Sequence, residues 1–265
     1  MSAEDNHLNK LELLKVDDVK ASYGLYKALF GVSMKIYNGE IVGLVGPNGS
    51  GKSTVARLVS GLIRPSAGKV YYLNAEISRM HAFKIARLGL FYIPEGRAVF
   101  STLTVEENLT LFFSNFIDNA KIVQRNNLDV NSLPRQDSGQ VELEDNTFES
   151  IGRHLSKKER IGLLVEETYK LFPKLKKLSK RKAGSLSGGE QRMLAISKAF
   201  VLNPKLIVFD ELSLGLSPRV SEEIWDIISS LRETNTTMLI LEQSLKNLDS
   251  TATRILRIES GKIVS

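Results

Sequence analysis

The stretch Gly46-Pro47-Asn48-Gly49-Ser50-Gly51-Lys52-Ser53 decides how this chain folds. It matches the phosphate-binding P-loop pattern at every specified position, with glycines where main-chain N–H groups must approach a phosphate. The apolar run Ile41 to Val45 leads into it, and apolar residues recur at helical spacing from Lys52 to Leu62. Strand, glycine-rich turn and helix are the context that this motif requires, so the sequence predicts an α/β nucleotide-binding domain.

Composition limits the class of protein. The 265 residues are 42% hydrophobic and 25% charged, which is ordinary for a globular chain, and they include no cysteine. Disulfides and thiolate metal sites are therefore excluded. No apolar stretch approaches the roughly 18 to 20 residues of a membrane-spanning helix, and Met1 to Lys10 lacks the apolar core of a signal peptide. We expect a cytosolic protein unless a partner holds it to a membrane.

The net charge of +6 is partly concentrated in one cluster. Its members are Lys174, Lys176, Lys177, Lys180, Arg181 and Lys182. A solvated helix end is the favoured interpretation, with attraction to anionic headgroups or nucleic acid as the alternatives. Because no aromatic residue interleaves with the cluster, base stacking is disfavoured and no nucleic-acid partner is expected.

The P-loop and a second apolar run assign the chemistry of the site. Lys52 is expected to neutralise the β- and γ-phosphates, Ser53 to ligate Mg²⁺, and Thr54 to contact the α-phosphate. The run Leu206 to Phe209 ends in Asp210, which we expect to face the magnesium. Glu211 follows directly and is the candidate base that orients or deprotonates the attacking water.

A second glycine-rich turn, Leu186-Ser187-Gly188-Gly189-Glu190-Gln191, lies 23 residues before Asp210. Serine, glycine N–H groups and a helix N-terminus together make another anion site. The P-loop, this turn and the strand ending in Asp-Glu, in that order, resemble the ABC-type ATPases, over roughly Leu11 to Val264. The fold class that the resemblance implies is α/β, a P-loop NTPase core with an antiparallel β subdomain and an inserted α-helical subdomain.

The resemblance also implies how the site is completed. Two ABC ATPase domains face head to tail, and the Ser187-Gly188-Gly189 signature of one closes over the ATP held by the other. With one copy of each motif, the chain must pair with itself or with a homologue. Tyr23 matches the aromatic that stacks on adenine, although a tyrosine there could also be an ordinary packing residue.

Two departures from the general ABC pattern narrow the subfamily. Glu95 stands where a glutamine usually senses magnesium and the γ-phosphate, and Gln243 replaces the usual switch histidine. Gln243 can donate a hydrogen bond but cannot titrate near neutral pH. With Ile93-Pro94-Glu95-Gly96-Arg97, Leu103 to Leu109 and Ser213 to Pro218, these positions resemble the second ATPase of branched-chain amino-acid importers.

That subfamily implies ATP and Mg²⁺ as cofactors and a place at the cytoplasmic face of the membrane. Its partners would be a second ABC ATPase subunit, two membrane permeases and, indirectly, an extracytoplasmic substrate-binding protein. The candidate catalytic residues are Glu211, Lys52, Gln243 and Glu95, and the candidate metal ligands are Ser53, Asp210 and Glu95. The candidate nucleotide-binding residues are Tyr23, Gly46, Pro47, Asn48, Gly49, Ser50, Gly51, Lys52, Ser53 and Thr54, with Ser187, Gly188 and Gly189 acting in trans.

One ABC nucleotide-binding domain over 1–265 is expected, with its helical subdomain at about 96–204. Strands are also predicted over Leu11–Ser22, Ala28–Ile36, Leu88–Ile93 and Met238–Leu241, and a helix from Ser217-Pro218 to Leu231. Capping boxes at Thr104/Glu107 and Ser156/Glu159 begin two more helices, the first extending through Leu111. From about Ser114 to His154 no period persists, which predicts a polar insertion, partly disordered or with one weak helix.

Other functions stay open at this stage. A urea or amide importer and a lipid or polysaccharide exporter use similar ATPases. A soluble ABC ATPase that remodels ribosomes or DNA is disfavoured, because the chain has neither a second ATPase unit nor a long coiled coil. A nucleotide-binding regulator without turnover is disfavoured by intact Lys52, Asp210 and Glu211.

Overall fold

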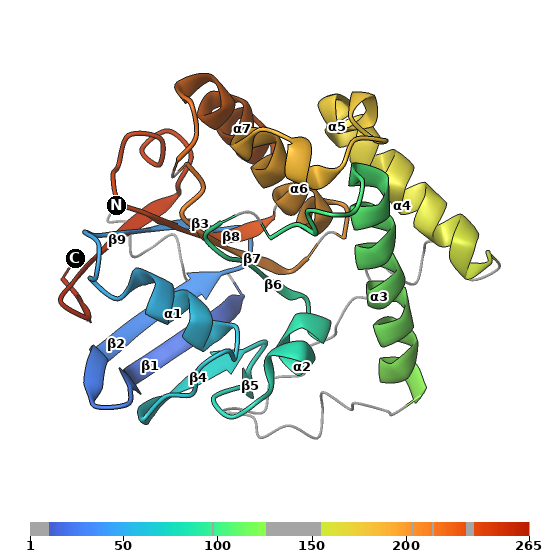
Figure 1. Ribbon diagram of the computed structural model, residues 1–265. Coiled ribbons are helices and arrows are strands. Elements are labelled where there is room, and N and C mark those ends of the chain that lie inside the picture. Colours follow the sequence, from blue (N-terminus) through green and yellow to red (C-terminus); the bar gives the residue numbers. More distant parts are fainter. Residues whose placement is uncertain are drawn as a thin grey trace.

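The computed structural model describes residues 11–96, 98–125, 155–202, 204–213, 215–231 and 236–264. Two β-sheets lie against helix α1, Lys52–Val59, and the remaining long helices gather on the other side of the larger sheet (Figure 1). Nowhere in these described ranges is there a helix long and apolar enough to cross a bilayer.

The larger sheet carries the P-loop. Its strand order is β10-β9-β3-β8-β7-β6, and all neighbours from β9 to β6 are parallel, whereas β10 pairs with β9 antiparallel. The strands are β3 (Ile41–Val45), β6 (Leu90–Ile93), β7 (Leu206–Asp210), β8 (Thr237–Glu242), β9 (Arg254–Glu259) and β10 (Lys262–Ile263). Parallel strands end at the same edge, so the P-loop after β3 and the acidic residues after β7 come together there.

Strict alternation along the central strands gives the sheet two apolar faces. In β7, Leu206 and Val208 join the core shared with α1, whereas Ile207 and Phe209 join the core under the helices. In β8, Leu239 and Leu241 likewise face α1. Continuing the alternation places the side chains of Asp210 and Gln243 on the α1 face, beside the P-loop.

The smaller sheet is antiparallel, with order β2-β1-β4-β5. Its strands are β1 (Glu12–Tyr23), β2 (Tyr26–Tyr37), β4 (Ala67–Tyr72) and β5 (Ala75–Glu76). The two long strands expected at the start of the chain are thus confirmed, and a tight hairpin at Gly24 joins them. Apolar side chains of this sheet, such as Leu14 and Val32, share one core with α1.

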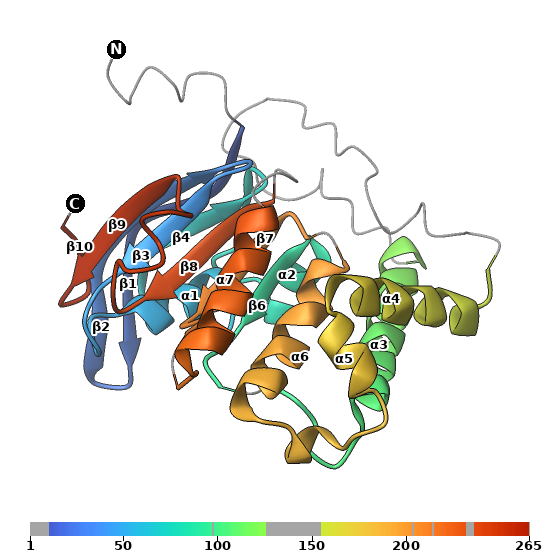
Figure 2. The same cartoon turned by 90° about the horizontal axis from the view of Figure 1, so that it is seen from above.

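Helices α3 to α7 gather on the other side of the parallel sheet, and their buried side chains share one core with it (Figure 2). The helices beyond α1 are α2 (Ala82–Arg87), α3 (Val105–Arg125), α4 (Lys157–Leu171), α5 (Pro173–Lys177), α6 (Gly188–Phe200) and α7 (Pro218–Leu231), with a 3₁₀ turn at Ala183–Ser185. Both predicted capping boxes are present: Thr104 and Glu107 exchange hydrogen bonds before α3, and Ser156 and Glu159 do so before α4.

The expected end of the third helix is wrong. The prediction stopped it at Leu111, yet α3 continues to Arg125. Phe113 and Ile117 extend the buried stripe that Val105 and Leu109 begin, at a spacing of four residues. The polar residues between them hid this spacing, so the prediction ended the helix too early. The remainder of the predicted insertion, 126–154, lies outside the described residues, as do Arg97 and Leu214.

The basic cluster is partly neutralised by neighbouring carboxylates. Lys174 pairs with Glu223 at 3.6 Å, Lys176 with Glu166 at 3.0 Å, and Lys180 with Glu106 at 2.6 Å. These exposed pairs agree with a solvated surface rather than with an uncompensated anion-binding patch.

Lys198 of α6 is a buried cation. Its side chain is 6% exposed, and its Nζ lies 5.7 Å from the centre of the Phe112 ring and donates to the Ala98 carbonyl at 3.4 Å. Burial lowers the pKa of Lys198 from its ordinary 10.5 to about 8. Below the lower pKa the folded state bears the full cost of desolvating the ammonium, and between pH 8 and 10.5 that cost fades as the folded form loses its proton first.

Lys198→Met should therefore stabilise the chain at pH 7 by about 2 kcal/mol, with a smaller gain at pH 9.5. The measurement is urea unfolding at both pH values, with Lys262→Met, at an exposed lysine, as the matched control. An equal gain at both pH values would show that packing, not the ammonium charge, accounts for the difference.

Candidate functional site

A cavity of about 420 Å³ opens at the edge of the sheet where β3 and β7 end. Residues from the P-loop, the β1–β2 hairpin, the loop after β6 and the ends of β7 and β8 line it. They are Tyr23, Tyr26, Ala28, Asn48, Gly49, Gly51, Lys52, Ser53, Thr54, Glu95, Glu211 and Gln243. The structure thus brings together most of the residues that the sequence predicts for nucleotide binding and catalysis.

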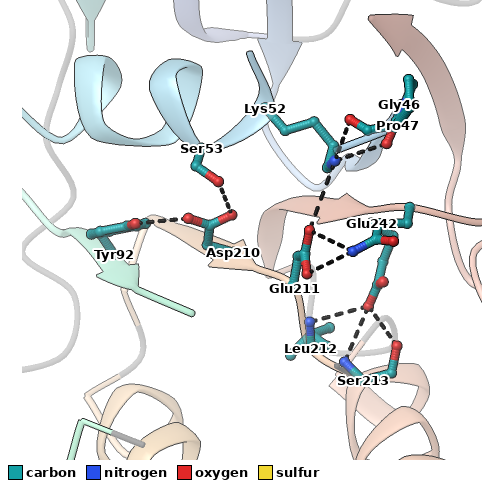
Figure 3. Close-up of polar contacts among 11 residues, drawn as sticks. Gly46, Pro47, Lys52, Ser53, Tyr92, Asp210, Glu211, Leu212, Ser213 and Glu242 are labelled. Carbon is teal, nitrogen blue, oxygen red and sulfur yellow. Dashed lines mark hydrogen bonds and ion pairs between the residues drawn. The ribbon is translucent and has the colours of Figure 1, made fainter. Parts of the chain in front are cut away.

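The P-loop wraps around its own lysine. Lys52 Nζ donates to the carbonyls of Gly46 at 2.7 Å and Pro47 at 3.1 Å, and the side chain is 4% exposed (Figure 3). Gly46 must be glycine, because a Cβ there would lie 2.2 Å from the Ile258 carbonyl oxygen. The ammonium is therefore held at the hollow of the loop by two main-chain oxygens, and the Glu211 carboxylate lies 3.7 Å from it.

Gly51, Lys52 and Ser53, at the start of α1, line the cavity. Gly51 precedes the helix with a left-handed φ of 107°, and no side chain caps the N-terminus. The Ser50 hydroxyl is buried and has no hydrogen-bond partner within the part of the chain that the structure describes. A helix N-terminus without a side-chain cap, beside an unpartnered hydroxyl, fits a ligand rich in anionic oxygens.

Asp210 is held from two sides. Its Oδ1 accepts from the Ser53 hydroxyl at 2.9 Å and its Oδ2 from the Tyr92 hydroxyl at 2.9 Å (Figure 3). Burial, followed by the neighbouring Asp210 carboxylate, raises the pKa of Tyr92, so the phenol stays protonated and donates. Tyr92 projects from the same face of β6 as Leu90, which packs in the core shared with α1.

Glu211 lies between two donors. Its Oε1 is 3.7 Å from Lys52 Nζ, and Gln243 Nε2 donates to both carboxylate oxygens, at 3.2 and 3.1 Å. The residue is 7% exposed, and its φ of 53° is in the left-handed region that non-glycine residues rarely adopt. This turn of the main chain carries Glu211 out of the strand and directs its carboxylate into the cavity.

Glu242 fixes the segment that follows Glu211. Its Oε1 accepts from the main-chain N–H groups of Leu212 at 3.1 Å and Ser213 at 3.3 Å, and from the Ser213 hydroxyl at 3.0 Å. Burial raises the pKa of Glu242, and the hydrogen bonds from Ser213 and Leu212 act against that rise.

Tyr23, at the end of β1, and Glu95, in the loop after β6, both line the cavity. Tyr23 ends β1 with 40% of its surface exposed, and its hydroxyl accepts from Arg57 Nη1 at 3.4 Å. Glu95 is exposed in the loop after β6. An exposed aromatic face and an exposed carboxylate at the cavity mouth are available to a ligand.

The Ser187-Gly188-Gly189 turn does not line this cavity. Ser187 is exposed and caps α6: its hydroxyl accepts from the Glu190 N–H at 3.3 Å, and its own N–H donates to Glu190 Oε2 at 2.9 Å. Gly189 is needed for packing, since a Cβ would lie 2.4 Å from Val220 Cγ1 of α7. A Cβ at Gly188 would meet nothing within 4 Å, so packing inside the chain gives no reason for that glycine.

Sequence reasoning missed three residues of this region. Tyr92 and Glu242 contact the segment that begins at Asp210 only because β6, β7 and β8 are neighbours, an order that the sequence alone does not reveal. Arg192 of α6 is the third, and it contacts both the loop after β6 and the end of β7. The alternation of β6 and β8 was the available signal for the first two, and no local pattern marked Arg192.

The site offers few metal donors, and they are oxygen atoms. Among the residues that the structure describes, no group of three or more His, Cys, Asp or Glu could hold a metal ion. Ser53 and Asp210 offer a hydroxyl and a carboxylate side by side, the oxygen donors that Mg²⁺ accepts when phosphates and waters complete its shell.

Comparison with known proteins agrees with this geometry. Residues 29–213 match the family described as ABC transporter. The chain is 34% identical over 252 residues to the high-affinity branched-chain amino acid transport ATP-binding protein BraG of Pseudomonas aeruginosa, covering 95% of this chain and 91% of that protein. It is 29% identical to the lipopolysaccharide export system ATP-binding protein LptB of Haemophilus influenzae, covering 96% of this chain and 90% of that protein.

Solved structures share the fold. The ADP conformation of an ATP-binding cassette of an ABC transporter matches with a TM-score of 0.70 and 25% identity, covering 96% of this chain and 90% of that one. A dimeric bacterial ABC transporter cassette matches with a TM-score of 0.73 and 22% identity, over 96% and 97% of the two chains, and bears on the fold alone. The predicted fold class is confirmed.

Proposed function

The chain belongs to the ABC transporter family as an ATP-binding ATPase subunit, and on that premise we propose that it drives the import of branched-chain amino acids through partner permeases. The observation that carries the catalytic part is the convergence of Lys52, Ser53 and Glu211 at one cavity, with Asp210 hydrogen-bonded to Ser53 behind it. Relatives named for branched-chain amino acid transport support the substrate class.

Each side chain has a part in the proposed reaction. Main-chain N–H groups of the P-loop and Lys52 bind the phosphates, and Lys52 exchanges its two carbonyl acceptors for phosphate oxygens. Tyr23 stacks on the adenine. Ser53 and Asp210 would hold Mg²⁺, with Glu95 beside them, and the ion when bound would neutralise charge on the β- and γ-phosphate oxygens.

Glu211 orients the attacking water and takes up its proton. Gln243 donates to both oxygens of Glu211 and so fixes the direction of the carboxylate. Because Gln243 does not titrate near neutral pH, this support is the same across the physiological range.

A second ATPase domain is needed to complete the site. Ser187, Gly188 and Gly189 lie away from the cavity of their own chain, on an exposed helix N-terminus. We propose that they bind the ATP of a partner ABC subunit, which is either a second copy or a homologue. Gly188, which packing does not require, is then explained by close approach of the partner's triphosphate.

The substrate and the setting rest on similarity. With two permeases and an extracytoplasmic binding protein, the subunit would be peripheral at the cytoplasmic face of the membrane. A single ABC domain over 1–265, with its helical part at about 96–204, would present the loop after β6 to the permeases. Lipid export is the second candidate, because LptB of Haemophilus influenzae is similar over nearly the whole chain.

Ser53→Ala tests the catalytic part of the proposal. Removing the hydroxyl beside Asp210 should raise the Mg²⁺ concentration for half-maximal phosphate release from ATP by about tenfold or more, because a metal ligand is lost. The measurement is phosphate release against Mg²⁺ concentration, using the subunit with its pairing partner.

Ser60→Ala is the matched control. Ser60 follows the same helix, and its buried hydroxyl donates to the Ala56 carbonyl at 2.7 Å, remote from the cavity. The control should keep the wild-type Mg²⁺ requirement. An unchanged requirement in Ser53→Ala would remove Ser53 from the metal site.

A further inference from the structure

Arg192 joins two segments of the site that come from distant parts of the chain. Its Nη1 donates to the carbonyls of Pro94 at 2.6 Å and Gly96 at 2.9 Å, on either side of Glu95. Its Nη2 donates to the carbonyls of Asp210 at 3.1 Å and Glu211 at 2.9 Å. One planar guanidinium therefore spans the loop after β6 and the catalytic end of β7.

These four carbonyl acceptors lie in the loop after β6 and at the end of β7, where the regular hydrogen bonding of the sheet stops. Gly96 has a φ of 99° and Glu211 a φ of 53°, so both segments leave their strands through left-handed turns. For Glu211, which is not a glycine, this conformation persists only where the surroundings fix it, whereas Gly96 adopts a positive φ without strain. The two Arg192 bonds on each segment are a direct means of fixing it.

Burying the Arg192 guanidinium costs free energy, and only a side chain that reaches all four acceptors can offset that cost. Arg192 is 4% exposed, and its desolvation lowers the pKa of the guanidinium, while Asp210, Glu242 and Glu95 act to raise it. Four carbonyl acceptors compensate for the lost water, and a lysine ammonium has neither the fork geometry nor the span to replace them.

We propose that Arg192 is a positioning residue that holds the Glu95 loop and the Asp210–Glu211 strand end as one rigid unit on the signature helix. Arg192 is five residues after Ser187, the N-cap of the same helix α6. A movement of the signature on meeting the partner's ATP is thereby passed to the chain's own catalytic carboxylate. This inference rests on the proposed function, because it requires that Glu211 and Glu95 serve ATP hydrolysis.

Arg192→Met and Arg192→Lys test the inference in the subunit assembled with its pairing partner. Both variants should lower kcat for ATP hydrolysis by about 100-fold, since a misplacement of about 1 Å costs that much, while KM for ATP stays near the wild-type value. KM should stay unchanged while kcat falls, because Arg192 does not contact the P-loop residues that bind ATP.

Arg254→Met separates positioning from stability. Arg254 Nη2 also donates to a main-chain carbonyl, that of Lys35 at 2.6 Å, and to buried Glu40 at 3.2 Å, but it lies at the other end of β9 from the P-loop edge. This control should unfold more easily and keep its kcat per folded molecule. Arg192→Met should lose kcat whatever its unfolding midpoint.

A double-variant cycle with Glu95→Gln completes the test. If Arg192 acts by holding the Glu95 loop, Glu95→Gln should reduce kcat much less in the Arg192→Met background than in the wild type. Effects that multiply, or a kcat for Arg192→Met within twofold of wild type, would overturn the inference while the wild-type protein still hydrolyses ATP. Wild-type protein that releases no phosphate would instead overturn the proposed function, and this inference with it.

Discussion

Glu211→Gln is expected to abolish turnover while preserving ATP binding. The substitution keeps the size of the side chain but removes the carboxylate that accepts from Gln243 and lies 3.7 Å from Lys52. Loss of a general base costs about 10² to 10⁴ in rate. Binding should hold or tighten, because one negative charge beside the triphosphate disappears, and the ATP-bound pair of subunits should stay closed.

Phosphate release over many turnovers and size-exclusion chromatography with ATP measure the two parts of this prediction. Glu259→Gln is a suitable control, since Glu259 is exposed on β9 and outside the cavity. Multiple turnover that persists in Glu211→Gln at the wild-type rate would remove Glu211 from the role of base.

Gly188→Asp is expected to reduce hydrolysis by about 10² to 10³, comparable to the loss of an oxyanion-binding donor. A Cβ at this position would meet nothing within 4 Å among the described residues, and an acidic residue in the first turn of α6 favours the helix. Folding should therefore be unharmed. The harm arises only if the partner's triphosphate must approach this turn, where the carboxylate would repel it.

Gly162→Asp provides the matched control, because Gly162 of α4 also has open space around its Cβ position. Phosphate release by paired subunits should be normal in Gly162→Asp and nearly lost in Gly188→Asp, with equal unfolding midpoints. A fully active Gly188→Asp would mean that the signature turn does not bind nucleotide from another subunit.

Much of the site could be predicted because the chemistry is local in sequence. The P-loop places Lys52 and Ser53 by its spacing, and alternation along β7 places Asp210 on the face that meets α1. When a buried apolar strand ends in two acidic residues, the sequence alone predicts that these residues lie at the edge of the sheet, without knowing which strands are its neighbours.

The supporting residues could not be predicted because they depend on the order of strands. Tyr92 reaches Asp210 only because β6 is next to β7, and Arg192 reaches both segments only because α6 packs over that edge. The length of α3 failed for a different reason. Ser, Asn and Asp residues at 114, 115, 118 and 119 interrupt the apolar spacing, and tertiary burial of Phe113 and Ile117 sustains the helix through them.

Uptake of labelled leucine tests the central claim most directly. Cells that lack this gene would be supplied with the wild-type chain or with Glu211→Gln, and uptake of labelled urea would be followed in parallel. The account predicts that only the wild type restores leucine uptake. If the wild-type chain restores urea uptake alone, the substrate would be urea rather than a branched-chain amino acid. If it restores uptake of neither solute, the importer function would be contradicted.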